Sequence, residues 1–396
     1  MRMASELANR HLLAAAHCIV IKVGSSSLTG EDGYLDCQAL HKLVNVVAKA
    51  HKRGQHVVLV SSGAVAAGIA PLGFHRRPKN VRDQQAAAMV GQAQLMSAYA
   101  EAFSRDHITV AQVLLTPEDV VDRRHYANVQ AALERLLHYG VIPIVNENDA
   151  VVTDDLRFGD NDRVAALVAH VVGASALVLC TDVDGLYTAP PTHPGAHLIS
   201  EISDFSQLES YSITGKGSDV GTGGMSSKVR AADIATAGGV GTLVVATSQL
   251  GEALAGKPVG TWFMPRAARK SARDLWLRYS AHGAGILYAD PGAIRALEAG
   301  GASLLAVGIT HVEGTFSAGD LVYVVPSDAD SSRAGSASSS NSSSSSSSSS
   351  QVPIGQGLVA FSSAEVKRFI GQAPYEHERR RAPRPVIHAD DFAHIK

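Results

Sequence analysis

Short apolar runs alternate with helix-like segments through the first part of the chain. The runs are rich in β-branched residues, as buried strands are, and lie at 19–23, 57–60, 108–115, 141–145, 176–180 and 242–246. Between them, the residue spacing is helical at 40–48, 82–105, 123–139 and 163–172. Strands that alternate with helices usually form a mostly parallel sheet covered on both faces. We therefore predict an α/β fold with a sheet sandwiched by helices, whose last strand ends at residue 246.

Polar or glycine-containing motifs follow the predicted strands. The carboxyl ends of parallel strands meet at one edge of a sheet, where open α/β folds bind their ligands. Each motif alone is also explained as a turn, because Ser, Asn, Asp and Gly are common turn residues. Five such motifs on one edge are much harder to explain in that way. They are Gly24–Ser27, Ser61–Ala64, Asn146–Asp149, Gly159–Asp162 and Thr181–Tyr187.

The stretch 221–228, Gly-Thr-Gly-Gly-Met-Ser-Ser-Lys, is the most informative motif. Its glycines let backbone N–H groups approach a ligand, and the helix expected at 229–237 adds unpaired donors at its start. Lys228 adds a point charge that suits a phosphate. The spacing is not that of a Walker A loop, and a plain helix-capping turn explains the stretch alone equally well. Together with the other motifs, it predicts an anion site.

Composition argues against several classes of function. The net charge of -2, from 35 basic and 37 acidic residues, gives no general attraction to nucleic acids or anionic membranes. No apolar run approaches the roughly 20 residues that span a bilayer, so we expect a cytoplasmic protein without membrane contact. The three cysteines are widely spaced, and the 17 histidines include no His-Glu-x-x-His pattern. Neither a disulfide framework nor a zinc site is predicted.

The two ends of the chain differ from this α/β part. We expect a ragged N-terminus at 1–17, a domain at 18–264 and a linker at 265–274. Beyond it, glycines punctuate short apolar runs, which predicts a small β-rich domain at 275–396. The stretch 327–351 contains an almost pure serine run, which cannot bury enough apolar surface to order itself. We predict that it is a disordered insertion in the second domain.

The motifs, taken together and in this order, resemble the amino acid kinase family over 18–264, and within it the glutamate 5-kinases. Related kinases for aspartate, N-acetylglutamate and carbamate generally have paired glycines after the first lysine, whereas this chain has Lys22-Val23-Gly24-Ser25-Ser26. The C-terminal part resembles a PUA domain. The resemblance implies ATP-dependent phosphorylation of the side-chain carboxylate of L-glutamate to L-glutamyl 5-phosphate, the first step of proline biosynthesis.

The resemblance also implies roles for single residues. Lys22 and Lys228 would flank the transferred phosphoryl group, and Asp162 would hold both lysines. Asp160 and Asp162 are the candidates for organising Mg²⁺. Glutamate would be bound by Ser62, Asp149 and Asn161. ATP would be bound by Lys22, Thr181, Asp182, Thr222, Gly223, Gly224, Met225, Ser226, Ser227 and Lys228.

Simpler explanations exist beside these roles. A lysine inside an apolar strand can belong to a structural salt bridge, because an unpaired buried charge is costly. For Asn161 or Asn148–Asp149 alone, turn formation would be our first choice. For Asp160, the alternative explanation is a solvated carboxylate in a loop.

Two other functions stay open. PUA domains often bind RNA, so the alternative from another class is an RNA-binding or regulatory protein with an inactive kinase-like domain. Intact Lys22, Asp162 and Lys228 argue against it. Among enzymes, the alternative is a related amino acid or carbamate kinase. The family further implies a homo-oligomer, feedback inhibition by proline and work alongside glutamyl phosphate reductase.

Overall fold

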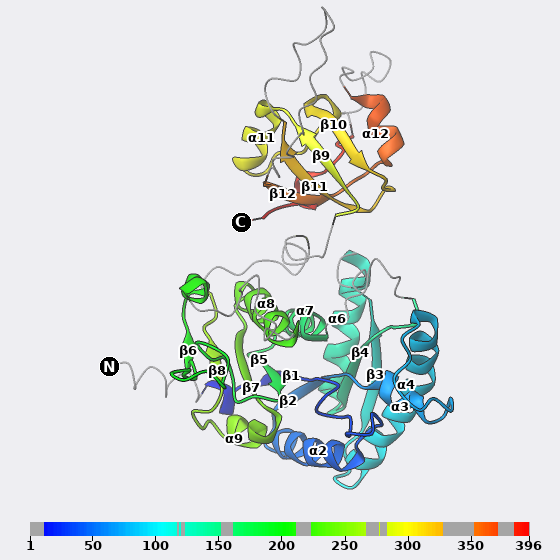
Figure 1. Ribbon diagram of the computed structural model, residues 1–396, viewed down its shortest axis with the longest axis vertical. Helices are drawn as coiled ribbons and strands as arrows, with labels where there is room; N and C mark the ends of the chain where they lie inside the picture. Colours follow the sequence, from blue (N-terminus) through cyan, green and yellow to red (C-terminus); the bar gives the residue numbers. More distant parts are fainter. Residues whose placement is uncertain are drawn as a thin grey trace, which may run out of the picture. The chain divides into compact units, whose positions relative to one another are not determined.

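The chain divides into two compact units, Met1–Ala272 and Arg273–Lys396, in a computed structural model (Figure 1). The structure describes residues 12–116, 119, 123–151, 161–210, 223–266, 277, 283–327, 352–370 and 384–395. Most of the expected ragged N-terminus and of the linker lie outside these residues. So does the predicted serine-rich insertion, apart from Ser327.

An eight-stranded sheet with the order β3-β4-β2-β1-β5-β7-β8-β6 forms the centre of the first unit. Six strands pair in parallel with their neighbours, which confirms the mostly parallel sheet. They are β1 (Cys18–Val23), β2 (His56–Ser61), β3 (Val110–Leu115), β4 (Ile142–Glu147), β5 (Ala176–Thr181) and β7 (Gly241–Ala246). Because they run in one direction, the polar residues that end β1, β2, β4 and β5 lie along one edge.

Two further strands correct the sequence prediction, which ended the sheet at residue 246. Strand β8 (Thr261–Phe263) pairs antiparallel with β7, and β6 (Glu201–Ile202) pairs with β8. Strands of two or three residues are too short to show a period in the sequence. Trp262 and Phe263 are nonetheless fully buried, so β8 closes the core at this end.

Helices cover both faces of this sheet. Figure 1 shows α2 and α9 on one side and α7 and α8 on the other. Helix α2 begins where the Asp36 side chain accepts hydrogen bonds from the backbone of Gln38 and Ala39, and its apolar stripe packs on β1 and β2. The helices of this unit are α2 (Cys37–Lys52), α3 (Ala64–Ile69), α4 (Val81–Ser104), α6 (Arg123–His138), α7 (Asn161–Val171), α8 (Gly223–Ala237) and α9 (Leu250–Leu254), with short 3-10 helices at Phe205–Ser210 and Thr247–Gln249.

The second unit contains a five-stranded sheet with the order β10-β9-β11-β12-β13, which confirms the β-rich second domain. Apolar side chains of these strands and of two capped helices form a core of their own. The elements are β9 (Gly285–Ala289), α11 (Pro291–Glu298), β10 (Ile309–Gly314), β11 (Leu321–Pro326), β12 (Gly355–Leu358), α12 (Ser363–Phe369) and β13 (Phe392–His394), with 3-10 helices at Ala306–Gly308 and Ala389–Asp391.

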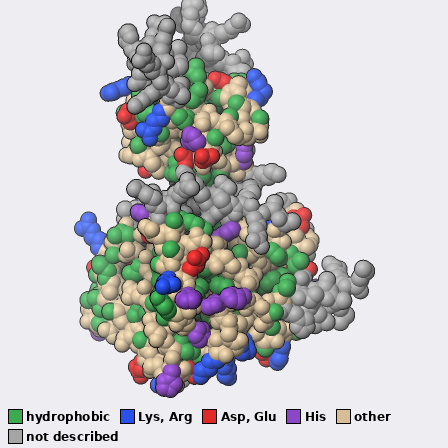
Figure 2. Space-filling model, turned by 180° about the vertical axis from the view of Figure 1, so that it is seen from behind, with side chains coloured by type: hydrophobic (Ala, Val, Ile, Leu, Met, Phe, Trp, Pro, Cys, Tyr) green, Lys and Arg blue, Asp and Glu red, His purple; other side chains and the backbone are tan. Residues whose placement is uncertain are grey.

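The surface shows charges of both signs. On the face seen in Figure 2, basic and acidic side chains lie near one another at the lower end of the first unit, with histidine side chains among them. This mixture agrees with the net charge of -2. Among the residues that the structure describes, no helix has both the length and the hydropathy to cross a bilayer.

Candidate active site

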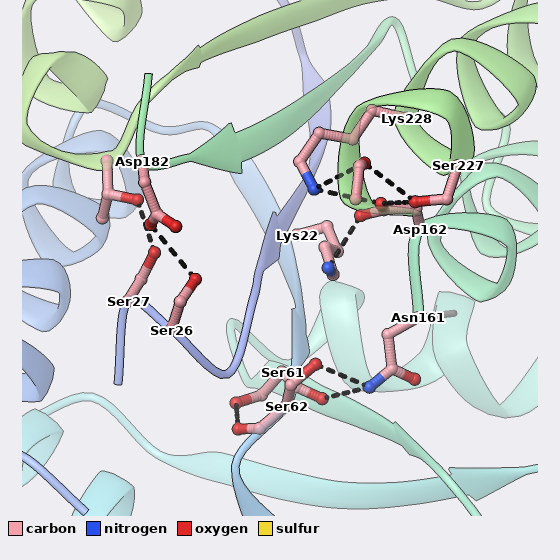
Figure 3. A network of polar contacts seen from close by, with 12 residues as sticks. Lys22, Ser26, Ser27, Ser61, Ser62, Asn161, Asp162, Asp182, Ser227 and Lys228 are labelled. Atoms are coloured by element: carbon pink, nitrogen blue, oxygen red, sulfur yellow. Dashed lines mark hydrogen bonds and ion pairs between the residues drawn. The ribbon is translucent and has the colours of Figure 1, made fainter. Parts of the chain in front are cut away.

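Two lysines and an aspartate form a buried charged cluster at the carboxyl edge of the sheet (Figure 3). Lys22 Nζ lies 2.7 Å from Asp162 Oδ1, and Lys228 Nζ lies 3.1 Å from Asp162 Oδ2. The Ser227 hydroxyl donates a further hydrogen bond of 2.8 Å to Oδ2. The exposed fractions are 6% for Lys22, 1% for Asp162 and 7% for Lys228. The structure therefore brings all three predicted catalytic residues into direct contact.

Three different elements supply this cluster. Lys22 is the penultimate residue of β1, where its side chain projects from the face opposite to Ile21 and Val23, which pack in the core with α2. Asp162 lies in the first turn of α7, and Lys228 lies near the start of α8. The helix at this motif begins at Gly223 rather than at residue 229, because the glycines and serines form its first turn instead of a separate loop.

The cluster has one more positive than negative charge. Burial alone would raise the pKa of Asp162, but the ammonium groups of Lys22 and Lys228 outweigh it and hold that pKa below its usual value. With Asp162 ionised, two positive charges face one negative charge in a poorly solvated place. A further anion would balance the charge, so the cluster is suited to a phosphate or carboxylate ligand.

A cavity of about 490 Å³ opens beside the cluster. The start of α8 forms part of its wall, and the unpaired backbone N–H groups and partial positive charge of a helix start suit an anion. The described residues that line it are Lys22, Gly24, Ser25, Ser26, Ser62, Asn161, Asp162, Gly224, Ser226, Ser227, Lys228 and Arg230.

The loop after β1 is tied to the ends of β5 and β7. Ser26 donates a hydrogen bond of 3.1 Å to the Asp182 carboxylate, and the hydroxyls of Ser27 and Thr247 lie 2.8 Å apart. Thr247 in turn donates to the backbone carbonyl of Thr181 at 3.2 Å. These bonds hold Thr181 and Asp182 next to the loop that lines the cavity.

Asn161 connects the cavity with the end of β2. Its amide nitrogen donates to the Ser62 hydroxyl at 2.8 Å and to the backbone carbonyl of Ser61 at 3.1 Å, as Figure 3 shows. The turn between β2 and α3 passes through Gly63, whose φ of 103° lies in the left-handed region that favours glycine. The predicted glutamate ligands Ser62 and Asn161 are therefore neighbours.

Comparison with known proteins identifies the family. The profile of the amino acid kinase family matches residues 17–247, and that of the PUA domain matches residues 285–376. A glutamate 5-kinase of Bifidobacterium adolescentis is 43% identical over 396 residues, which cover 99% of each chain. One of Salinispora arenicola is 45% identical over 387 residues, which cover 97% of this chain and 99% of that one. The chain belongs to the glutamate 5-kinases of the amino acid kinase family.

One solved structure is also similar to part of this chain. Carbamate kinase from Giardia lamblia bound to AMP-PNP matches with 19% identity and a TM-score of 0.47, covering 64% of this chain and 100% of that chain.

The predicted site residues fall into three groups. Those that line the cavity are Lys22, Ser62, Asn161, Asp162, Gly224, Ser226, Ser227 and Lys228. Others do not appear in its described lining: Asp149 is half-buried in the turn after β4, Thr181 ends β5 and Asp182 follows it, and Gly223 and Met225 belong to the first turn of α8. Asp160 and Thr222 lie outside the described residues.

Arg230 is a cavity residue to which the sequence analysis gave no role. It is exposed and lies one helical turn after Ser226 on α8. The signal in the sequence was the spacing of four residues from Ser226, which places both side chains on one face of a helix. That spacing could be used only once the helix was known to begin at Gly223.

The described residues fit a metal ion poorly as direct ligands. They contain no group of three or more His, Cys, Asp and Glu side chains that could hold one. The predicted ligand Asp162 already has an ammonium group on each carboxylate oxygen. The other predicted ligand, Asp160, lies outside the residues that the structure describes. The geometry favours Asp162 as the partner of the two lysines.

Proposed function

We propose that this chain transfers the γ-phosphoryl group of ATP to the side-chain carboxylate of L-glutamate, which forms L-glutamyl 5-phosphate in the first step of proline biosynthesis. The observation that carries the proposal is the buried cluster of Lys22, Asp162 and Lys228 beside a cavity. It occurs in a chain that is 43–45% identical to glutamate 5-kinases over nearly its whole length.

The acceptor group needs no general base. A glutamate side chain has a pKa of about 4.3 in water and is already ionised at neutral pH. Among the described residues that line the cavity, Asp162 is the single carboxylate, and both of its oxygens are held by lysines. Asp162 is therefore engaged as a lysine partner, which agrees with a reaction that needs no proton removed from the acceptor.

Charge neutralisation is the main requirement of this reaction. The glutamate carboxylate and the ATP phosphates repel each other, and negative charge spreads over the transferred group in the transition state. Lys22 and Lys228 approach from different elements and are held by one aspartate, so their ammonium groups are positioned before the substrates bind. We assign both lysines to the transferred phosphoryl group.

The two substrates are assigned to different parts of the site. The start of α8, with Gly224, Ser226 and Ser227, would bind the phosphates of ATP through backbone donors and hydroxyls. Ser62 and Asn161 would hydrogen-bond the polar groups of glutamate, and Asp149 would pair with its ammonium group. The contact between Ser62 and Asn161 supports a common role for these two residues.

Mg²⁺ belongs to the proposal as a companion of ATP. This ion keeps several waters and is commonly bound by substrate phosphates with few protein ligands. It would neutralise part of the phosphate charge, while the residues described above hold the lysines and the acceptor. This arrangement requires no cluster of carboxylates beside Asp162.

The partners follow from the proposed reaction and from the family. Glutamyl 5-phosphate is a reactive acyl phosphate, so we propose that a glutamyl phosphate reductase consumes it. We also propose that proline inhibits the reaction by feedback, that the chain assembles into a homo-oligomer and that it acts in the cytoplasm.

The test is ADP release from Mg²⁺-ATP with glutamate, aspartate, N-acetylglutamate or carbamate as acceptor. Hydroxylamine in the assay traps an acyl phosphate as a hydroxamate. We expect ADP and hydroxamate with glutamate alone. Activity with another acceptor instead would assign the chain to a related kinase, and no activity with any acceptor would refute the kinase function and direct attention to RNA binding.

A further inference from the structure

A chain of buried amide groups extends from the cavity to helix α4. Asn161 Nδ2 donates to Asn146 Oδ1 at 3.0 Å, and Asn146 Nδ2 donates to Gln92 Oε1 at 2.9 Å. Asn146 lies at the end of β4 and is 3% exposed, and Gln92 lies in the middle of α4 and is 8% exposed. Gln92 does not line the cavity itself. The amide chain nevertheless connects it with a residue that does.

Two backbone groups act together with the Gln92 side chain to orient these amides. The backbone N–H of Glu147 donates to Asn146 Oδ1 at 2.9 Å, so the amide nitrogen of Asn146 must point the other way, toward Gln92. The backbone carbonyl of Ser61 accepts from Asn161 Nδ2 at 3.1 Å. Asn161 therefore turns its nitrogen toward Asn146 and Ser61 and keeps its oxygen for another partner.

The oxygen of Asn161 is left for a ligand. Asn161 Oδ1 is buried and has no hydrogen-bond partner among the residues that the structure describes. A buried acceptor without a partner costs free energy, which a bound donor would recover. The ammonium group of an amino acid is such a donor, and Asn161 lines the cavity.

We propose that Gln92 is a positioning residue of the amino acid site, which holds Asn146 so that Asn161 keeps its oxygen free for the ammonium group of the acceptor. This inference rests on the proposed function, because it assumes that an amino acid binds beside Asn161. Gln92 acts only through its oxygen, since its Nε2 is buried and has no partner among the described residues. Glutamate at this position would keep the acceptor, whereas methionine would remove it at similar length.

The packing of α4 supports this role. Tyr99 lies two turns after Gln92, and its hydroxyl forms a 2.8 Å hydrogen bond with Ser61 Oγ in a fully buried contact. Helix α4 therefore contacts the ends of β2 and β4 through two polar side chains on one face. The glycine at position 91, beside Gln92, lets α4 approach α3 so closely that a methyl group there would overlap the carbonyl oxygen of Ala64.

The experiment compares Gln92→Met and Gln92→Glu with the full-length wild type. KM and kcat are measured separately for glutamate and for ATP, and the shift in melting temperature caused by glutamate alone is recorded. We expect Gln92→Met to raise KM for glutamate about tenfold, the effect of losing one well-placed polar contact. KM for ATP should stay within about twofold. Gln92→Glu should keep KM for glutamate within about threefold of the wild type.

Gln55→Met is the matched control. Gln55 is also buried, at 6% exposure, and its amide donates to the backbone carbonyls of Leu13, Ala14 and Ala16 just before β2, at the opposite edge of the sheet. Its loss should lower the melting temperature without changing KM for glutamate selectively. Equal effects of the two methionine variants on KM would indicate a merely structural role and overturn the proposal.

Other outcomes are also decisive. A folded Gln92→Met variant with wild-type KM for glutamate, and a wild-type shift in melting temperature with that ligand, would overturn the positioning role. Should Gln92→Met fail to fold by circular dichroism, the Gln92→Glu variant decides: wild-type KM supports the role, and a tenfold increase contradicts it. Failure of the wild type to phosphorylate glutamate would instead refute the proposed function.

Discussion

At the scale of single residues, Asp162 determines the electrostatics of the site. One carboxylate serves Lys22, Lys228 and the Ser227 hydroxyl. Removing one member of a buried ionic cluster leaves the others with uncompensated charge, which is why such clusters are sensitive to single substitutions. Loss of a single lysine, however, does not leave Asp162 without a partner, because each carboxylate oxygen has its own lysine. Without Lys228, Asp162 still has Lys22 as a partner at 2.7 Å.

We therefore expect Lys228→Ala to affect turnover far more than stability. The loss of one charge at the transferred phosphoryl group should lower kcat by about 100- to 1000-fold, while the melting temperature should fall by only a few degrees. Steady-state kinetics and thermal unfolding followed by circular dichroism measure the two effects. Lys257→Ala, which removes an exposed pair with Glu252 at 3.5 Å, is the control and should change neither. Wild-type turnover of Lys228→Ala would remove the catalytic role.

Histidines at the other edge of the sheet predict how stability depends on pH. The rings of His17 and His56, at the starts of β1 and β2, lie 4.7 Å apart. Burial, with the neighbouring His17 and His51, lowers the pKa of His56 below 6.5, and burial also lowers the pKa of His51. The imidazoles of His51 and His56 therefore take up protons more readily in the unfolded chain than in the folded one. Their neutral forms stabilise the fold above about pH 6.5, and this contribution is lost as the pH falls through the lowered values.

Substitution of His56 by glutamine tests this pH dependence. Between pH 7.5 and 5.5, the melting temperature should fall less in His56→Gln than in the wild type, because one group no longer takes up a proton on unfolding. Differential scanning fluorimetry in matched buffers measures it. His193→Gln, in an exposed loop, is the control. An equal loss of stability in wild type and His56→Gln would show that His56 is not responsible.

At the scale of elements, the contact between α3 and α4 positions the polar residues at the ends of β2 and β4. Gly68 and Gly91 lie where the backbones of the two helices approach each other, and a side chain at either would overlap a carbonyl oxygen of the opposite helix. This close approach allows Tyr99 to contact Ser61 and Gln92 to contact Asn146. The helix pair therefore determines the geometry of the amino acid side of the site.

We expect Gly91→Ala to destabilise the first unit by about 1–3 kcal/mol, the usual effect of overpacking. KM for glutamate should rise as well, because Gln92 and Tyr99 move with the helix. Urea unfolding and steady-state kinetics measure the two effects. Gly251→Ala is the matched control: a methyl group there meets only Val46 at ordinary contact distances, so the helix α9 should gain about 0.4–1 kcal/mol. Equal stability of the two variants would contradict the packing argument.

At the scale of the whole molecule, the two units have separate cores. One large described cluster joins β1 and β2 with α2, α4 and α9, and another joins the strands of the second unit with α11 and α12. Each cluster draws all its residues from one unit. Separate cores permit each unit to unfold without the other.

A substitution in the second core tests this independence. Leu287 lies in β9 and is fully buried, so Leu287→Ala should destabilise the second unit by about 2–5 kcal/mol. We expect one calorimetric transition of the full chain to move to lower temperature, while kcat and KM for glutamate and ATP stay within about twofold of the wild type. A parallel loss of kinase activity at a temperature where the first unit is folded would show that the units depend on each other.

Local patterns were sufficient to predict most elements of the first unit. The six parallel strands and the long helices have apolar periods that reflect burial of one or both faces, and such periods are visible without any tertiary information. The predicted beginning of α8, at residue 229, was wrong by six residues, because Gly223 and Gly224 look like loop residues in the sequence. Strands β6 and β8 were missed, since pairing with a neighbour, and not a local pattern, makes them strands.

The sequence by itself therefore determined the fold class and the edge of the sheet where Lys22, Asp162 and Lys228 lie, because both follow from local periodicity and from the common direction of parallel strands. Only the tertiary structure decided how these residues pair. Lys228 and Asp162 are 66 positions apart in the chain, and their contact depends on how α7 and α8 pack. The same holds for Gln92, which looks like any polar residue of a helix until the packing of α3 against α4 brings it to Asn146.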